Sequence, residues 1–267
     1  MSYSARALYT LHLADNALIL GHRNSEWTGH GPILEQDIAL SNIALDLIGQ
    51  ARNLYQHAAT LINGEGPAGS QRRRLAGEPG TPVTEDLLAY HRDGWDFRNC
   101  LLVEQANGDW GRTILRQFFF STYQFFLYDQ LQHSHDTQLS AIGEKSVKEA
   151  AYHLRWSSEW VIRLGDGTAE SHHRMTKALD DLGKFTEEML VPAEYEQQLA
   201  TEQIAVDLAL IRPKWEERIF EVLAEGQLSL PTVVGQKGGK EGRHTEQLGY
   251  VLAEMQFLQR AYPGCEW

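Results

Sequence analysis

Apolar positions recur at helical spacing along almost the whole chain. This pattern predicts helices over about residues 4–22, 34–62, 110–132, 138–164, 171–190, 207–225 and 245–262. Pro213 falls inside one of them and is expected to disturb its start. Because these helices are long and carry apolar seams, we expect an all-α fold: one up-down helical bundle with additional flanking helices, in a single domain over residues 1–267.

The helix predicted at 34–62 carries the clearest seam, with the three-four spacing of a helix packed inside a bundle. The seam consists of Leu40, Ile43, Leu47, Leu54 and Leu61. Ile38, Leu45 and Ile48 lie beside this seam. The helix is therefore apolar over more than half of its circumference, and we expect it to be central.

Two glycine-rich stretches interrupt the helical pattern. Residues 64–82 are rich in Gly and Pro, and we expect a flexible loop there; its basic run, Arg72 to Arg74, could meet an acidic partner or CoA phosphates, but a solvated loop is favoured. A second excursion covers about residues 228–244 and includes QKGGKEGRH. Its backbone N–H groups could cradle phosphate, although a mobile hairpin or an interface loop is the favoured interpretation.

Composition narrows the classes of function. The 267 residues are 42% hydrophobic, which is enough for a large core, and the most aromatic stretch, FFFSTYQFFLY, is broken by polar residues, so no membrane span is expected. The two cysteines lack metal-type spacing, and a reduced, cytoplasmic protein is the simplest inference. A net charge of -12 disfavours nucleic acid and anionic lipid as partners.

The segment KEAAYHLRW places Glu149 and His153 one helical turn apart. A di-iron bundle needs a Glu from each of two helices and a Glu-x-x-His from each of two others. The two Glu-x-x-His occurrences, at 170–173 and 241–244, fall at a helix start and in the glycine-rich excursion, where a bundle core could not use them. Glu149 and His153 could be half of a metal site, but the favoured interpretation is a Glu–His pair at the edge of the core, hydrogen-bonded to each other or to a neighbouring helix.

Polar residues predicted to face the bundle interior support this second interpretation. On the helix at 34–62 they follow a stripe that ends at His57, and each must find a hydrogen-bonding partner. The predicted polar core consists of Asn42, Asp46, Gln50, Asn53, Arg116, Glu149 and His153. Asp46 paired with Arg116 or with His153 would be satisfied without iron. Since amides are poor iron ligands, we expect no catalytic, metal-binding or cofactor-binding residue in this chain.

Several segments together resemble the C subunits of bacterial phenylacetyl-CoA epoxidases. These are residues 13–54, LLVEQANGDW at 101–110, residues 148–168 and HTEQLGYVLAEMQFLQR at 244–260. The resemblance implies a ferritin-like bundle that is a non-catalytic partner of a related A subunit with a di-iron centre. In that family the A subunit uses O2 to convert phenylacetyl-CoA to its ring-1,2-epoxide. A reductase subunit delivers electrons from NADPH, and the complex also contains a small B subunit.

A structural subunit should present apolar or aromatic side chains to its partner. We expect this interface at Trp156, Trp160, Phe118 and Phe125, with self-association (a homo-oligomer) when the chain is expressed alone. Two alternatives stay open. One is a catalytic, metal-dependent oxygenase or oxidase that uses Glu149 and His153, and the other is a free-standing helical bundle for binding or iron storage.

Overall fold

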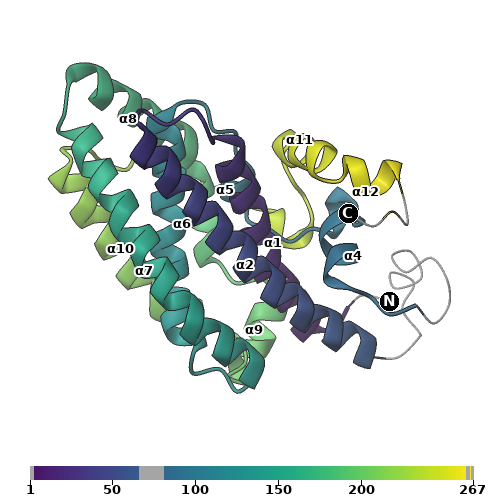
Figure 1. Cartoon of the computed structure of the whole chain (residues 1–267). Helices are drawn as coiled ribbons and strands as arrows, with labels where there is room; N and C mark the ends of the chain where they lie inside the picture. The colour runs from purple at the N-terminus through teal and green to yellow at the C-terminus, as the bar shows by residue number, and fades with distance from the viewer. Residues whose placement is uncertain (1–2, 66–80, 263–264, 266–267) are drawn as a thin grey trace.

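The computed structural model describes residues 3–65, 81–262 and 265, and these residues contain helices and connecting segments but no strand (Figure 1). The predicted loop at 64–82 and the basic run Arg72–Arg74 lie, apart from the two ends of that loop, outside the described residues. None of the described helices is long and apolar enough to cross a membrane. The all-α prediction is confirmed.

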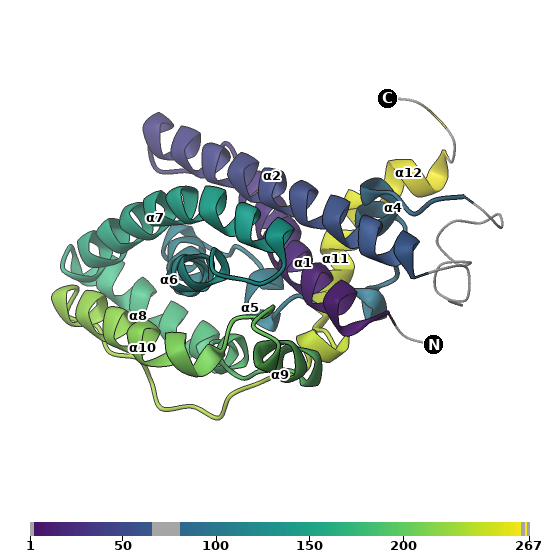
Figure 2. The ribbon, with the colours of Figure 1, turned by 90° about the horizontal axis from the view of Figure 1, so that it is seen from below.

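Four long helices form the bundle, as two antiparallel pairs. The first pair is α1 (Ala5–Glu26) with α2 (Leu34–Gly64), and the second is α6 (Trp110–Leu131) with α7 (Thr137–Gly165). Polar side chains start three of them: Ser4, Asp109 and Asp136 each accept a hydrogen bond from a backbone N–H of the first turn. The two pairs meet where α2 packs on α7 (Figure 2).

Shorter helices surround this bundle. On the α6 side lie α8 (Ala169–Leu182) and α10 (Leu208–Glu225), and α9 (Glu194–Thr201) packs on α1. At the other end of the molecule lie α4 (Glu85–Tyr90), α11 (Glu246–Met255) and α12 (Phe257–Ala261) (Figure 1). The short α5 (Leu101–Glu104) packs on α1 and α6. The 3-10 turns are η1 (Gly94–Asp96), η2 (Gly183–Phe185), η3 (Glu187–Leu190) and η4 (Gly239–Glu241).

Several details of the helices differ from the sequence-based expectation. The helix predicted at 171–190 ends at Leu182 and continues as 3-10 turns. The last helix is interrupted at Gln256, which separates α11 from α12. Pro213 does not disturb the start of α10, because in the second turn it removes only one helical hydrogen bond and leaves the later turns intact.

The most enclosed helix is α1 rather than α2. Buried residues occur on every side of α1, whereas α2 keeps an outward side on which Ile38 and Leu45 are 52% and 66% exposed. The expectation of a central α2 is therefore wrong. Its buried seam, which includes Leu40, Leu47 and Leu54, covers only the side that faces α1.

Candidate functional site

A ladder of polar contacts joins α2 to α7 inside the bundle. Nε2 of His153 donates to Oδ2 of Asp46 at 3.0 Å, and one turn away Nε2 of Gln50 donates to Oε2 of Glu149 at 2.8 Å. Because the helices are antiparallel, residues one turn apart on α2 meet residues one turn apart on α7 in reverse order. His153 and Gln50 are fully enclosed, while Asp46 keeps 38% of its side chain exposed.

The ladder continues toward both ends of the two helices. Toward the C-terminus of α2, Nε2 of His57 donates to Oδ2 of Asp136 at 3.0 Å. Burial by itself raises the pKa of Asp136, but the His57 hydrogen bond and two backbone N–H donors more than offset it and lower that pKa. Toward the other end, the indole N–H groups of Trp156 and Trp160 both donate to Oε1 of Gln36, at 3.0 and 2.8 Å.

Helix α6 adds a second set of neutral groups behind the ladder. Nε2 of Gln124 donates to Oε1 of Gln50 at 2.9 Å, and the Tyr128 hydroxyl donates to the same oxygen at 3.2 Å. Burial raises the pKa of Tyr128, so this hydroxyl stays protonated and acts as a neutral hydrogen-bonding group. The interior of the bundle at this level is therefore lined by amides and a phenol.

These donors do not fit a di-iron centre. Such a centre needs four carboxylates and two imidazoles converging on one point, whereas here Glu149 is bound by the Gln50 amide and Asp46 is bound by His153. Across the part of the chain that the structure describes, no three His, Cys, Asp or Glu side chains gather closely enough to hold a metal ion. The Nδ1 atom of His153 is buried and has no protein partner. This single ring nitrogen is not enough to hold a pair of metal ions.

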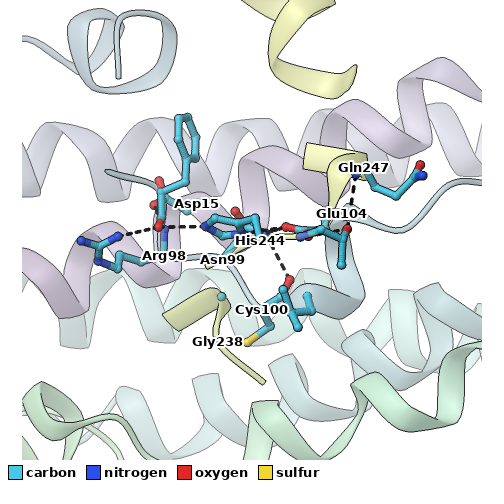
Figure 3. A network of polar contacts seen from close by, with 12 residues as sticks. Asp15, Arg98, Asn99, Cys100, Glu104, Gly238, His244 and Gln247 are labelled. Carbon is cyan, nitrogen blue, oxygen red and sulfur yellow. Dashed lines mark hydrogen bonds and ion pairs between the residues drawn. The ribbon is translucent and has the colours of Figure 1, made fainter. Parts of the chain in front are cut away.

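A second polar network lies around α1, away from the ladder (Figure 3). The carboxylate of Asp15 pairs with the guanidinium of Arg92, accepts from the Tyr55 hydroxyl at 2.5 Å and accepts from the backbone N–H of Arg98 at 2.7 Å. Asp15, Arg92 and Tyr55 are almost completely buried. Since the carboxylate has donors on both oxygens, the network is satisfied internally and fixes the segment 92–98 against α1.

The same region holds a buried ion pair. Nζ of Lys240 lies 2.8 Å from Oε2 of Glu196, with both side chains 2% exposed. Burial alone raises the pKa of Glu196, but the Lys240 ammonium, His12 and the backbone N–H of Ala193 together outweigh it and lower that pKa. Nδ1 of His12 donates to the carbonyl of Arg98 at 2.7 Å, and its Nε2 accepts from the Asn16 amide; burial lowers the pKa of His12, in keeping with this neutral ring.

Buried carboxylates also hold the glycine-rich excursion in place. The backbone N–H groups of Gly238 and Gly239 both donate to Oε1 of Glu188 at 2.7 Å, so the groups that could cradle phosphate instead bind a carboxylate of the same chain. A side chain at Gly239 would place its Cβ 2.2 Å from the backbone oxygen of Asn99. Glycine is therefore required there by close packing, and these contacts hold the part of the excursion around Gly238 and Gly239 in place.

The end of the excursion is held by Glu104 of α5. Its two carboxylate oxygens accept from Nδ1 of His244 at 2.8 Å, from the Asn99 amide at 2.8 Å and from the backbone N–H of Thr245 at 2.7 Å (Figure 3). His244 therefore binds Glu104, 140 residues away in sequence. Its two ring nitrogens both contact acceptors other than Glu241, the glutamate that precedes it in the Glu-x-x-His pattern at 241–244.

A family model for phenylacetic acid catabolic proteins matches residues 2–267. The chain belongs to this family. It is also 46% identical over 260 residues to the C subunit of 1,2-phenylacetyl-CoA epoxidase of Escherichia coli (strain K12), and the alignment covers 97% of this chain and 98% of that protein. The resemblance inferred from the sequence segments is thereby confirmed.

Within this family member, the predicted polar core separates into groups. Asp46, Gln50, Glu149 and His153 meet in the ladder, as the spacing suggested. Asn42 is exposed and Asn53 is half-buried, and neither takes part in the ladder contacts described above.

Arg116 is fully buried but binds elsewhere. It donates to the carbonyl of Gln105 and to Oδ1 of Asn107 rather than to Asp46. Without an adjacent carboxylate, burial lowers the pKa of Arg116 to about 9. Of the two partners predicted for Asp46, the structure therefore shows His153.

The predicted interface residues lie deeper than expected. Phe118 is completely buried and Trp156 is 8% exposed, so neither can form a partner surface in this conformation. Phe125 and Trp160 are partly buried, and the ring of Trp110 packs edge-on against Trp160. The aromatic pattern on α6 and α7 thus serves largely to pack this chain's own core.

Sequence reasoning missed the network around α1. One signal was present: His12, Asp15 and Asn16 interrupt an otherwise apolar helix and lie on one side of it, three and four residues apart. A polar stripe inside an apolar helix predicts buried hydrogen bonds. Their partners, including Arg92, Arg98 and Cys100, are too distant in sequence to be assigned from spacing.

Proposed function

We propose that this chain is a structural, non-catalytic subunit of a phenylacetyl-CoA 1,2-epoxidase and acts in phenylacetate catabolism in the cytoplasm. Its similarity over nearly the full length to the C subunit of the E. coli epoxidase supports this assignment. The pairing of Glu149 with Gln50 and of Asp46 with His153 supports a structural role, because these side chains satisfy one another and leave no converging ligand set.

In this proposal the chemistry takes place on a related catalytic A subunit that holds the di-iron centre. Phenylacetyl-CoA, O2, two electrons and two protons give the ring-1,2-epoxide and water, so one oxygen atom forms two C–O bonds and the other leaves as water. NADPH supplies the electrons through a reductase subunit, and a small B subunit belongs to the complex. This chain contributes a rigid helical surface that keeps the A subunit in its active conformation.

The test is co-expression of the A subunit with and without this chain, followed by size-exclusion chromatography and an O2-dependent turnover assay with phenylacetyl-CoA, B subunit and reductase. We expect the two chains to co-elute and turnover per A subunit to fall strongly when this chain is absent. Equal turnover without this chain would refute the structural role.

Metal analysis of this chain, purified alone, separates the proposal from its alternatives. We expect well below one iron per chain, because Asp46, Glu149 and His153 already bond within the ladder. About two irons per chain, lost in a Glu149→Gln variant, would favour a catalytic or iron-storing bundle instead.

A further inference from the structure

The ring of His244 lies between two oxygen acceptors. Its Nδ1 is 2.8 Å from Oε2 of Glu104 (Figure 3), and its Nε2 is 3.1 Å from the carbonyl oxygen of Phe97. A neutral imidazole carries one N–H and can donate to only one of these oxygens, whereas an imidazolium donates to both. The geometry of the site therefore fits the protonated ring.

The carboxylate of Glu104 cannot supply the missing proton. Glu104 is completely buried, and three further donors reach it: the Asn99 amide at 2.8 Å, and the backbone N–H and hydroxyl of Thr245 at 2.7 and 2.8 Å. Four donors on two oxygens is the arrangement of an ionised carboxylate, which only accepts. Both contacts of His244 are therefore hydrogen bonds only when both ring nitrogens carry protons.

Glu104 is the charged group that contacts this ring among the described residues. Other charged groups on the surrounding elements have partners of their own: Arg23 with Glu26, Lys240 with Glu196, Arg243 with Glu241, Arg98 with backbone carbonyls, and Glu188 with backbone N–H groups. Asp96 and Glu246 are the nearest remaining ones in sequence. His12 on α1 has a pKa lowered by burial and stays neutral at about pH 7, so it does not compete as a titrating group.

These contacts of His244 connect three parts of the structure. Phe97 belongs to the segment 92–98, which is fixed against α1, and Glu104 is the last residue of α5. Thr245, the next residue after His244, caps the start of α11 and also binds Glu104. His244 therefore joins the start of α11 to α5 and to the segment 92–98.

Few apolar contacts hold α11 and α12 in place otherwise. The buried side chains of α11 are Leu248, Val251 and Leu252, and α12 buries none of its residues. A groove of about 560 Å³ lies between these helices and Gly94. The docking of α11 therefore depends on polar contacts at its start, and histidine is the side chain whose charge ordinarily changes near neutral pH.

We propose that His244 is a pH-sensitive latch that holds α11 against α5 and the segment 92–98. With the second proton bound, both hydrogen bonds of the ring are made; without it, one nitrogen faces an oxygen with no hydrogen between them. A proton that is held in the folded state, and that an unfolded chain releases at about pH 6.5, makes the docking weaker as the pH rises. This inference concerns contacts within the chain and does not depend on the proposed function.

The experiment follows the full-length chain from about pH 5 to about pH 9. Histidine-selective ¹⁵N NMR reports the number of ring N–H groups of His244, whose signal is assigned by its absence from a His244→Gln variant. Hydrogen exchange, corrected for the chemical exchange rate at each pH, reports the protection of the α11 backbone amides. We expect this protection to fall at least about tenfold as His244 loses its second proton, since a hydrogen bond between charged groups commonly contributes that much.

Two variants identify the group responsible. His244→Gln keeps one donor but has no titrating charge, so the protection of α11 should be reduced and should not change over this pH range. The matched control is His57→Gln, which alters another buried His–carboxylate pair, 3.0 Å from Asp136. It should leave the pH dependence of α11 as in the wild type.

The wild type alone can overturn the proposal, even if a variant does not fold. A His244 ring with a single N–H over the whole pH range would refute it, as would α11 protection that stays constant while His244 titrates. A pH dependence that persists in His244→Gln would assign the effect to another group and would also refute the latch.

Discussion

Replacing Lys240 by methionine should strongly destabilise this protein. Nζ of Lys240 lies 2.8 Å from the Glu196 carboxylate and 3.0 Å from the carbonyl of Val191, and its side chain is 2% exposed. Methionine keeps most of the volume but removes the charge and the donors. Glu196 then remains buried, with the backbone N–H of Ala193 at 2.7 Å as its remaining close donor.

A buried carboxylate that loses its cation costs about 3–5 kcal/mol of unfolding free energy. Urea unfolding followed by far-UV circular dichroism measures this loss, and the melting temperature should fall by roughly 10 °C. The double variant Lys240→Met with Glu196→Gln should be more stable than Lys240→Met alone, because it leaves no unpaired charge.

The control is the exposed pair Arg218–Glu221, whose atoms lie 3.3 Å apart. Arg218→Met should change the unfolding free energy by less than about 1 kcal/mol. If Lys240→Met also costs less than about 1 kcal/mol, or if the double variant is no better than the single one, the buried pair does not hold the glycine-rich segment as described.

Three further predictions concern single residues. The lowered pKa of Glu196 gives stability that is complete above about pH 4.5 and is lost as the pH falls through the folded-state pKa, so Glu196→Gln should flatten the acid side of the stability–pH curve; an unchanged curve would contradict this. Gly239→Ala should cost about 1–3 kcal/mol by steric overlap, whereas Gly249→Ala, in open space on a helix, should be neutral or stabilising; equal melting temperatures would refute the close-packing argument. Gln50→Leu should cost about 1–3 kcal/mol in urea unfolding, since it leaves buried ladder groups without partners; no loss would show that they find others.

The sequence predicted the residues of the ladder, but not their pairing, because these residues repeat at helical spacing within two long helices. Asp46 and Gln50 are four apart, as are Glu149 and His153, so each pair had to share one side of its helix. Which side chains meet depends on how α2 and α7 are aligned along their lengths, and periodicity does not contain that information. Hence Arg116 was an equally reasonable partner for Asp46 before the structure was known.

The network around α1 could not be predicted for a different reason. Its contacts join residues far apart in the chain, such as Asp15 with Arg92 and Glu104 with His244. The outer side of α2 shows a third limit. An apolar residue such as Leu45 has the same helical spacing whether it faces its own core or another protein, so sequence alone placed it in the interior.

The central claim is that Glu149 and His153 hold this bundle together and do no chemistry. The most direct test is phenylacetyl-CoA turnover, per A subunit, of a co-purified complex whose copy of this chain carries Glu149→Gln and His153→Gln. We expect turnover within about twofold of the wild type, because neither residue touches the reacting atoms in this account. A loss of about a hundredfold or more, in a complex that is still folded and still carries its A subunit, would contradict it.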